Sequence, residues 1–218
     1  MLSVVIPALN AAATIGACIG AVREADEILV VDGGSTDATA EIALRNGARV
    51  VCSRPGRGVQ LAAGAAAAEG DWLLFLHADT LLAAGWRKAA DRHIVRQCGK
   101  AACFRLRLDA REWQARLVEA GVALRVRLFG LPYGDQGLLI SRRLYHAVGG
   151  YRPLPLMEDV DLVRRIGAPL VGRLSVAALT SAERWRRDGW LRRSGRNLLC
   201  LLLYRFGVSA ERVARLYA

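Results

Sequence analysis

The sequence lacks the features that mark several classes of protein. No run of apolar residues approaches the roughly 20 needed to cross a bilayer, and the longest later run is only 198–203. The first residues lack the basic region and cleavage site of a secretory signal. An odd number of cysteines without a CxxC pair argues against a disulfide framework. We therefore expect a cytoplasmic protein that does not span the membrane, with reduced thiols that mostly fill the core.

Familiar nucleotide and nucleic-acid motifs are also missing. The glycine-arginine loop 54–58 has neither the lysine and spacing of a Walker A motif nor a GxGxxG pattern. A nucleotidyltransferase, which is one alternative function, would carry a glycine-rich signature with a lysine near the N-terminus, and residues 8–13 have neither. A nucleic-acid-binding protein is a second alternative because the net charge is +11, but no RRM, KH or helix-turn-helix signature accompanies it.

The positive charge is concentrated towards the end of the sequence. From Arg184 onwards there are nine arginines against Asp188 and Glu211. Because several of these arginines precede the apolar run 198–203, peripheral contact with an anionic membrane is one interpretation. The other is that this segment packs on the core or on a second copy in a homodimer.

Composition and periodicity predict one α/β domain. The chain has 218 residues, of which 53% are hydrophobic and 23% charged, as in globular proteins. Strands are predicted at 2–7, 27–31, 49–52 and 72–76, and they alternate with helices at 11–23, 36–46 and 59–68. This alternation predicts parallel strands joined by right-handed crossovers in a layered sheet.

The second half is less regular. We predict helices at 84–97, 110–128, 143–148, 159–166 and 188–204. Strands are predicted at 101–108 and 138–141, with an edge strand at 174–180. No internal repeat or flexible linker separates the two halves, so we expect them to be fused.

Polar side chains follow the predicted strands where ligands bind in such sheets. Asn10, Asp32 and Arg57 follow the first three strands, and His77 and Asp79 follow the fourth. The glycines after Asp32 let the backbone approach a flat ligand, and its carboxylate can accept from a base N–H or a ribose hydroxyl. The alternative is a plain strand-to-helix turn, with Ser35 or Thr36 as the helix cap, in which Asp37 merely favours the helix N-terminus.

Two carboxylate motifs indicate metal binding and proton transfer. His77 and Asp79 would point to the same side of an extended segment, where Asp79 suits Mg²⁺ or Mn²⁺ and His77 suits Mn²⁺ better. Alternatively, His77 only forms a local hydrogen bond. Glu158, Asp159 and Asp161 crowd a predicted helix start, which could leave one carboxylate suited to general-base work. An ordinary acidic helix start is the alternative.

Taken together, these motifs resemble the family 2 glycosyltransferases. The resemblance lies in Val4–Asn10, Val31–Asp37, Asp79 and the pair Glu158–Asp159. A closer resemblance is to the bacterial radical-SAM/selenodomain-associated transferases, whose hallmarks match Phe75–Thr80, Pro132–Gly137, Met157–Asp159 and Thr180–Trp185. The similarity runs over essentially the whole chain.

This resemblance implies a GT-A fold, a Rossmann-like and mostly parallel sheet flanked by helices, and inverting transfer from a UDP- or GDP-linked sugar with Mn²⁺ or Mg²⁺. The nucleotide sugar would contact Pro7, Ala8, Asn10, Asp32, Arg57 and Asp79. Asp79 would hold the metal, together with His77, and Asp159 would be the catalytic base. The acceptor side would comprise Gly134, Asp135, Gln136 and Glu158. Arg184 and Trp185 match the end of a QxxRW pattern.

The resemblance also divides the chain into a donor half (1–100), an acceptor half (101–183) and a basic C-terminal segment (184–218). Three positions depart from the family pattern. Ala11 replaces an acidic residue, His77 replaces the first aspartate of a DxD metal motif, and Ser181 replaces the glutamine of QxxRW. Because no membrane segments follow, a single transfer is favoured over processive synthesis. The acceptor would be a small or lipid-linked molecule, with no specific nucleic-acid partner.

Overall fold

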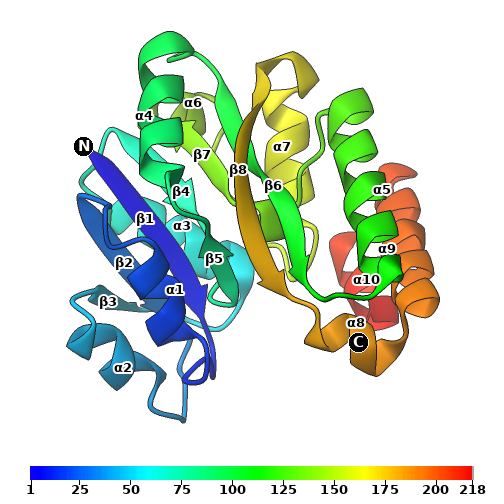
Figure 1. Cartoon of the computed structure of the whole chain (residues 1–218), viewed down its shortest axis with the longest axis horizontal. Helices are drawn as coiled ribbons and strands as arrows, with labels where there is room; N and C mark the ends of the chain where they lie inside the picture. Colours follow the sequence, from blue (N-terminus) through cyan, green and yellow to red (C-terminus); the bar gives the residue numbers. More distant parts are fainter. Residues whose placement is uncertain (218) are drawn as a thin grey trace.

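The computed structural model describes residues 1–217, and within them eight strands form one mixed sheet (Figure 1). The strands are β1 (Leu2–Ala8), β2 (Glu27–Asp32), β3 (Arg49–Cys52), β4 (Trp72–Phe75), β5 (Thr80–Leu82), β6 (Ala101–Asp109), β7 (Leu138–Ser141) and β8 (Val171–Ser181). Their order across the sheet is β3-β2-β1-β4-β7-β6-β8-β5. The α/β fold class predicted from the sequence is confirmed.

Strand directions divide the sheet into two parts. β1 pairs in parallel with β2 and β4, and β2 pairs in parallel with β3, as the alternating pattern predicts. β7 then runs antiparallel to both β4 and β6, while β6 and β8 are parallel. The prediction that 174–180 forms an edge strand is wrong, because β8 lies between β6 and the short antiparallel strand β5.

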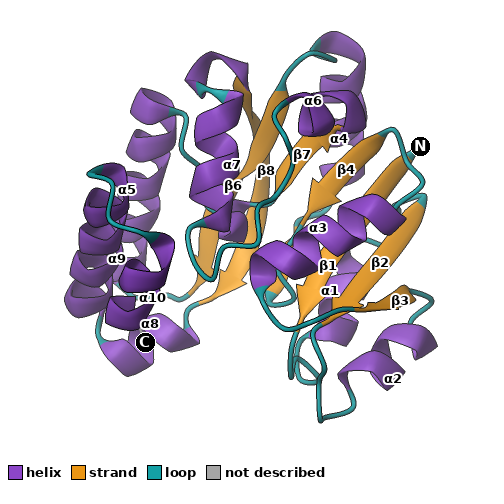
Figure 2. Ribbon diagram, turned by 180° about the vertical axis from the view of Figure 1, so that it is seen from behind, coloured by secondary structure: helices purple, strands orange, loops and turns teal. Residues whose placement is uncertain are grey.

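Helices cover both faces of the sheet. They are α1 (Ile15–Ala21), α2 (Thr39–Arg45), α3 (Arg57–Ala67), α4 (Trp86–Arg96), α5 (Trp113–Phe129), α6 (Arg142–Ala147), α7 (Glu158–Ile166), α8 (Glu183–Asp188), α9 (Trp190–Arg205) and α10 (Ala210–Tyr217), with 3₁₀ turns η1 (Gly134–Gln136) and η2 (Ala168–Leu170). One core cluster joins α1, α2 and α4 to one face, and another joins α3, α6 and α7 to the opposite face. Figures 1 and 2 show these two layers from opposite sides.

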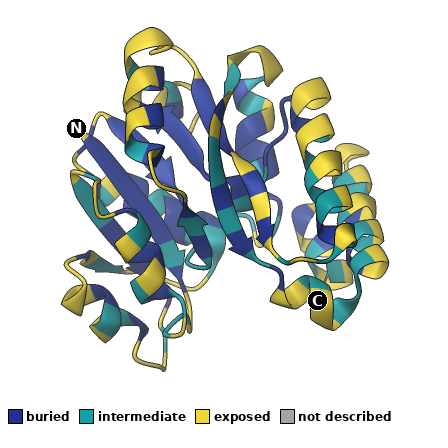
Figure 3. Cartoon of the chain, viewed as in Figure 1, coloured by how far each residue is buried: buried dark blue, intermediate teal, exposed yellow. Residues whose placement is uncertain are grey.

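Alternating side chains explain why two cores form. Val4 and Ile6 of β1 belong to the first cluster and Val5 to the second, because successive residues of a strand face opposite sides. On the second face α3 lies very close to the sheet, since a Cβ added at Gly64 would come within 2.3 Å of Val5 Cγ1. Figure 3 shows that the central strands are largely buried.

Several helix bounds differ from those predicted. α1 begins only at Ile15, because the backbone N–H groups of 10–12 donate to side chains of the loop before α2 and of Thr39, the first residue of α2. α2 begins at Thr39 and its cap position is Ala38, so the predicted capping by Ser35 or Thr36 is wrong. The predicted helix 188–204 is broken at Gly189, which has φ of +83° and separates α8 from α9. β5 and α10 were not predicted.

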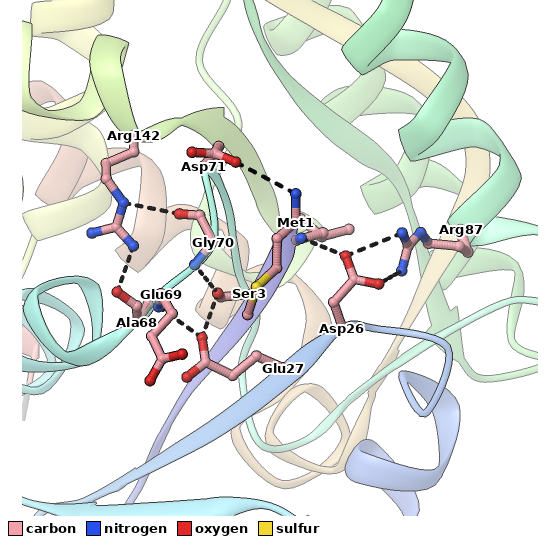
Figure 4. A network of polar contacts seen from close by, with 11 residues as sticks. Met1, Ser3, Asp26, Glu27, Ala68, Glu69, Gly70, Asp71, Arg87 and Arg142 are labelled. Carbon is pink, nitrogen blue, oxygen red and sulfur yellow. Dashed lines mark hydrogen bonds and ion pairs between the residues drawn. The ribbon is translucent and has the colours of Figure 1, made fainter.

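A polar network ties together the amino ends of the first strands (Figure 4). The Ser3 hydroxyl donates to Glu27 (2.5 Å) and accepts from Gly70 N–H (2.8 Å). Arg142 donates to the Gly70 carbonyl (2.9 Å), while Asp26 accepts from Leu2 N–H (2.7 Å) and is paired with Arg87. These polar groups therefore find their partners within the chain. This edge of the sheet lies opposite the strand ends that carry the candidate site.

Two expectations about composition can be compared with the fold. Three of the five cysteines, Cys18, Cys103 and Cys200, are buried and all five are free, as expected for thiols that mostly fill the core. Among the helices described in 1–217, none is long and apolar enough to cross a membrane.

Candidate active site

The loops that follow β1 and β2 are locked together by Asn10 and Asp32. The Asp32 carboxylate accepts from the Ser35 N–H (3.0 Å) and hydroxyl (2.5 Å), and from Gly34 N–H (3.2 Å). Asn10 N–H donates to the Ser35 hydroxyl (2.9 Å), and Asn10 Oδ1 accepts from Thr36 N–H (2.9 Å). The two predicted nucleotide-binding residues thus share Ser35, which explains why Ser35 does not cap α2.

Gln60 of α3 is hydrogen-bonded to the strand ends that precede these loops. This residue was not identified from the sequence. Its buried amide donates to the carbonyls of Ala8 (2.7 Å) and Val31 (2.8 Å), at the ends of β1 and β2. Ala8 itself is buried, whereas Pro7 is partly exposed. A polar residue on the sheet-facing side of the otherwise apolar helix α3 is the signal that could have revealed this role.

Arg57, at the first position of α3, points across the site to the start of α7. Its guanidinium lies 3.4 Å from the carboxylate of Glu158. Burial opposes the charge on Arg57, but the nearby carboxylates of Glu158, Asp159 and Asp79 outweigh it and raise the arginine's pKa. The chain therefore brings together four predicted site residues, Arg57 of α3, Asp79 of the loop after β4, and Glu158 and Asp159 of α7.

His77 lies in a turn, in contrast to the predicted extended segment. Thr80 N–H donates to the His77 carbonyl (3.1 Å), so His77 and Asp79 belong to one reverse turn between β4 and β5. Burial, together with the positive charges of Arg57 and Arg184, holds the pKa of His77 well below its usual value. The ring is consequently neutral at pH 7 and packs against Gly134, where an added Cβ would lie 2.3 Å from Nε2.

Asp159 lies where α7 approaches η1. One carboxylate oxygen accepts from Gly134 N–H (2.7 Å) and the other from Val160 N–H (2.7 Å), and the residue stays partly exposed. Its neighbour Glu158 is different, since only 2% of its side chain is exposed. Burial and the charge of Asp159 raise the pKa of Glu158 to about 7, against the opposing effect of Arg57.

The other predicted acceptor-side residues occupy η1. Gln136 is buried and donates to the Phe104 carbonyl (3.1 Å), so like Glu158 it faces the protein interior. Asp135 is partly exposed, and burial of its carboxyl raises its pKa to about 6 although Arg125 opposes the shift. The Asp135 carbonyl accepts from Thr180 (3.1 Å), which fixes η1 to β8.

Arg184 and Trp185, at the start of α8, diverge. Arg184 is exposed, and its positive charge contributes to the lowered pKa of His77. Trp185 instead stacks on Trp190, with ring centroids 5.8 Å apart. The two halves of the predicted motif therefore face different surroundings.

Backbone conformation also marks the site. Among residues 1–217, Asn10 (φ 50°) and Met157 (φ 66°) are the two non-glycine residues with positive φ. Asn10 follows β1 and Met157 immediately precedes Glu158 and Asp159. Strained residues of this kind persist where the surrounding structure imposes them, and they cluster at functional sites.

The candidate metal ligands fit a Mg²⁺ or Mn²⁺ ion that is shared with a diphosphate. The described part of the chain contains no cluster of three or more His, Cys, Asp or Glu side chains that could enclose a metal. Asp79 and a neutral His77 supply two candidate ligands. This number suits ions that bind through one or two protein groups and take their other ligands from phosphates and water.

Sequence comparison identifies the family. The family model described as Glycosyl transferase family 2 matches residues 3–113. The chain belongs to this family.

Individual relatives match shorter segments. Glucosyl-3-phosphoglycerate synthase of Mycobacterium tuberculosis is 39% identical over 94 residues, which cover 37% of this chain and 29% of that protein. A PGL/p-HBAD biosynthesis glycosyltransferase of Mycobacterium bovis is 41% identical over 99 residues, covering 38% and 36% respectively. The matched segments thus span about a third of these relatives.

Solved structures match nearly the whole chain. M. tuberculosis glucosyl-3-phosphoglycerate synthase in complex with Mn²⁺ and UDP-glucose has a TM-score of 0.66 at 25% identity, covering 95% of this chain and 79% of that one. The same synthase with Mn²⁺, UDP and glucosyl-3-phosphoglycerate has a TM-score of 0.64 at 26% identity, covering 95% and 80%. These similarities confirm the predicted GT-A fold.

Proposed function

We propose that the protein transfers one sugar at a time, with inversion at the anomeric carbon, from a UDP-sugar to an acceptor hydroxyl. The observation that carries the proposal is the position of Asp159. Its carboxylate accepts from Gly134 N–H (2.7 Å), and the residue is partly exposed. The negative charges of Asp159 and Asp79 both help to raise the pKa of Arg57. A base on the acceptor side is thus close to the donor-side groups.

In this proposal the donor lies over the loops after β1 and β2. Pro7, Ala8 and Asn10 border the nucleoside, and Asp32 reads the base from a turn already fixed by Ser35. Arg57 faces the diphosphate, and its charge is kept by the surrounding carboxylates. UDP is favoured over GDP because the similar mycobacterial synthase was solved with UDP and UDP-glucose.

Asp79, assisted by His77, would hold a Mn²⁺ or Mg²⁺ ion on the donor. Such an ion neutralises the negative charge that grows on a departing diphosphate. The mycobacterial synthase was likewise solved with Mn²⁺ and with Mg²⁺. Arg184 adds positive charge on the same side, consistent with its effect on His77.

Asp159 would accept the proton of the acceptor hydroxyl as the oxygen bonds to the anomeric carbon and the bond from that carbon to the diphosphate oxygen breaks. Gly134 orients the base, and Asp135 borders the acceptor. Glu158 and Gln136, which are buried, take a supporting role in this proposal: Glu158 positions Arg57, and Gln136 anchors η1.

The finer assignments belong to the same proposal. Within the family, the motifs quoted from the sequence would place the chain near the radical-SAM/selenodomain-associated transferases. Residues 1–100 would form the donor half and 101–183 the acceptor half, joined in one continuous sheet. The basic segment from 184 onwards would lie beside the acceptor; residue 218 is outside the described residues.

Two measurements test the proposal. A thermal-shift screen should show stabilisation by UDP-sugars in the presence of Mn²⁺, and weaker stabilisation by GDP-sugars. Asp159→Asn should lower kcat by about 10²–10⁴-fold, the usual contribution of a general base, while the Kd for the UDP-sugar stays unchanged. Asp71→Asn, at an exposed position on the opposite edge, is the matched control. Equal loss of donor binding in Asp159→Asn would contradict its role as base.

Salt-sensitive binding to random DNA without nucleotide-sugar binding would favour a nucleic-acid-binding protein instead.

A further inference from the structure

A large apolar groove lies beside the candidate active site. It has a volume of about 1450 Å³ and runs between α5, α7 and α9. Leu117, Leu124 and Leu128 of α5 and Leu198 and Leu202 of α9 line it and are between 40% and 61% exposed. Figures 1 and 2 show α5 and α9 side by side, and Figure 3 shows how much of both is exposed. Because pockets for small ligands are usually about 300–1,000 Å³, this groove suits a larger or elongated molecule.

Unpartnered polar atoms lie in the groove near η1. Arg125 Nη2 and Asp135 Oδ1 are buried without a hydrogen-bond partner in the described chain, and both residues line the groove. Arg125 is held in place, since its Nε donates to the Leu131 carbonyl (2.9 Å) and its guanidinium lies 3.4 Å from the ring centroid of Tyr133. Buried donors and acceptors are rarely left unpaired, so this pair points to a polar group of a ligand.

The same end of the groove adjoins the proposed base. Asp135 follows Gly134, whose N–H binds Asp159, and Val160 follows Asp159 and lines the groove. A ligand lying in the groove with its polar end at Arg125 therefore brings that end next to the Asp159 carboxylate. α5 has 17 residues, a length of about 25 Å, which is sufficient for a single acyl chain.

Charge identifies the kind of molecule. Four arginines line the groove, namely Arg125, Arg164, Arg192 and Arg205, against the single acidic residue Asp135. In a symmetric dimer this patch would face an identical one, and the like charges would repel. An anionic ligand is instead attracted, and an apolar chain removes the exposed leucines from water.

We propose that the acceptor is an anionic amphiphile: its apolar chain occupies the α5–α9 groove, its anionic group lies at Arg125, and its hydroxyl faces Asp159. The inference rests on the proposed function and names the acceptor class for that site. The reaction is unchanged. The hydroxyl oxygen bonds to the anomeric carbon, its proton passes to Asp159, and the nucleoside diphosphate leaves.

Calorimetric titration of the full chain with three matched probes tests this acceptor class. A 1-dodecanoylglycerol 3-phosphate carries the chain, the anion and a hydroxyl, 1-dodecanoylglycerol lacks the anion, and glycerol 3-phosphate lacks the chain. Below its micelle concentration, the complete probe should bind at least about tenfold more tightly than either part. Binding of the complete probe no tighter than glycerol 3-phosphate, or no binding at all, overturns the inference.

Variants at exposed positions show where the probe binds. Leu128→Asp, in the groove, should weaken binding of the complete probe about tenfold or more, because it places a carboxylate beside both chain and anion. Leu44→Asp, on α2 at nearly the same exposure (60% against 61%), is the control and should leave binding unchanged. Equal effects of the two variants contradict the assigned location.

Two further readouts separate this inference from its alternatives. Sedimentation that reveals a dimer dissociated by Leu128→Asp, with no binding of the complete probe, would assign the groove to a second copy and overturn the inference. UDP-sugar binding is measured on the same samples. If UDP-glucose binds with Mn²⁺ and the amphiphile does not, only the acceptor inference fails. If UDP-glucose does not bind either, the proposed function fails as well.

Discussion

Replacing Gln60 by leucine would test how the sheet supports the donor loops. The change keeps a side chain of similar size in α3 and removes two hydrogen bonds, to the carbonyls of Ala8 (2.7 Å) and Val31 (2.8 Å). The Ala8 carbonyl would still accept from Gly33 N–H (2.9 Å), so it would not be left bare. At about 0.5–1.5 kcal/mol for each hydrogen bond, Gln60→Leu should reduce the free energy of unfolding by about 1–3 kcal/mol.

For a chain of this length, each kcal/mol corresponds to about 2–4 °C in Tm, so we expect a decrease of about 2–12 °C, measured by calorimetry. Because the two carbonyls precede the loops that hold Asn10 and Asp32, the Kd for UDP with Mn²⁺ should also increase. Gln97→Leu, at an exposed position after α4, should change neither quantity. An unchanged Tm together with an unchanged Kd for UDP in Gln60→Leu would refute the supporting role.

Two other predictions concern the interior of the site. Burial raises the folded-state pKa of Glu158 from 4.5 to about 7. Between these pH values the folded protein keeps a proton on Glu158 that the unfolded chain has released. The free energy of unfolding should therefore fall as pH rises from about 4.5 to 7. Denaturant titrations should show a smaller fall in Glu158→Gln; an identical pH profile would contradict the shift. Gly134→Ala places a Cβ 2.3 Å from His77 Nε2, which should cost about 1–3 kcal/mol of stability and displace the ring. The Mn²⁺ concentration needed for UDP binding should then rise, whereas Gly20→Ala, with open space around it, should leave it unchanged; a wild-type Mn²⁺ response in Gly134→Ala would argue against metal binding by His77.

The regular part of the fold was predictable because it follows from local periodicity. The strand at 49–52 has the predicted bounds, and the helices of the first half alternate with strands as expected. β5 is only three residues long, and it pairs with β8, about 100 residues away. Such pairing leaves no local signal, so the position of β8 inside the sheet could not be inferred.

Tertiary competition explains the main local errors. Ser35 has the residue type of a helix cap, but its hydroxyl is used by Asp32 and Asn10 across two loops. The segment after β4 reads as extended, but Thr80 closes a turn onto the His77 carbonyl. In both cases a contact outside the local pattern determines the conformation.

That the candidate residues gather at one edge of the sheet was predictable, whereas the contacts among them were not. Asn10, Asp32 and Asp79 follow strands, so the sheet topology alone brings them to one edge. The pairing of Arg57 with Glu158 joins residues 101 positions apart, and nothing near either residue indicates it. Which of the carboxylates is buried likewise depends on how α7 packs, and the individual roles of the site residues stay predictions.

The reversed direction of β7 has a consequence for how specificity can change. The loops proposed to bind the donor come after their strands, but η1 reaches the same edge by preceding β7, which runs antiparallel to β4. The stretch 110–137, comprising α5 and η1, can therefore vary in sequence without altering any residue of the nucleotide loops. Exchanging this stretch between relatives, with Gly134 kept because it packs against His77, should change the acceptor while the choice of nucleotide sugar is inherited unchanged.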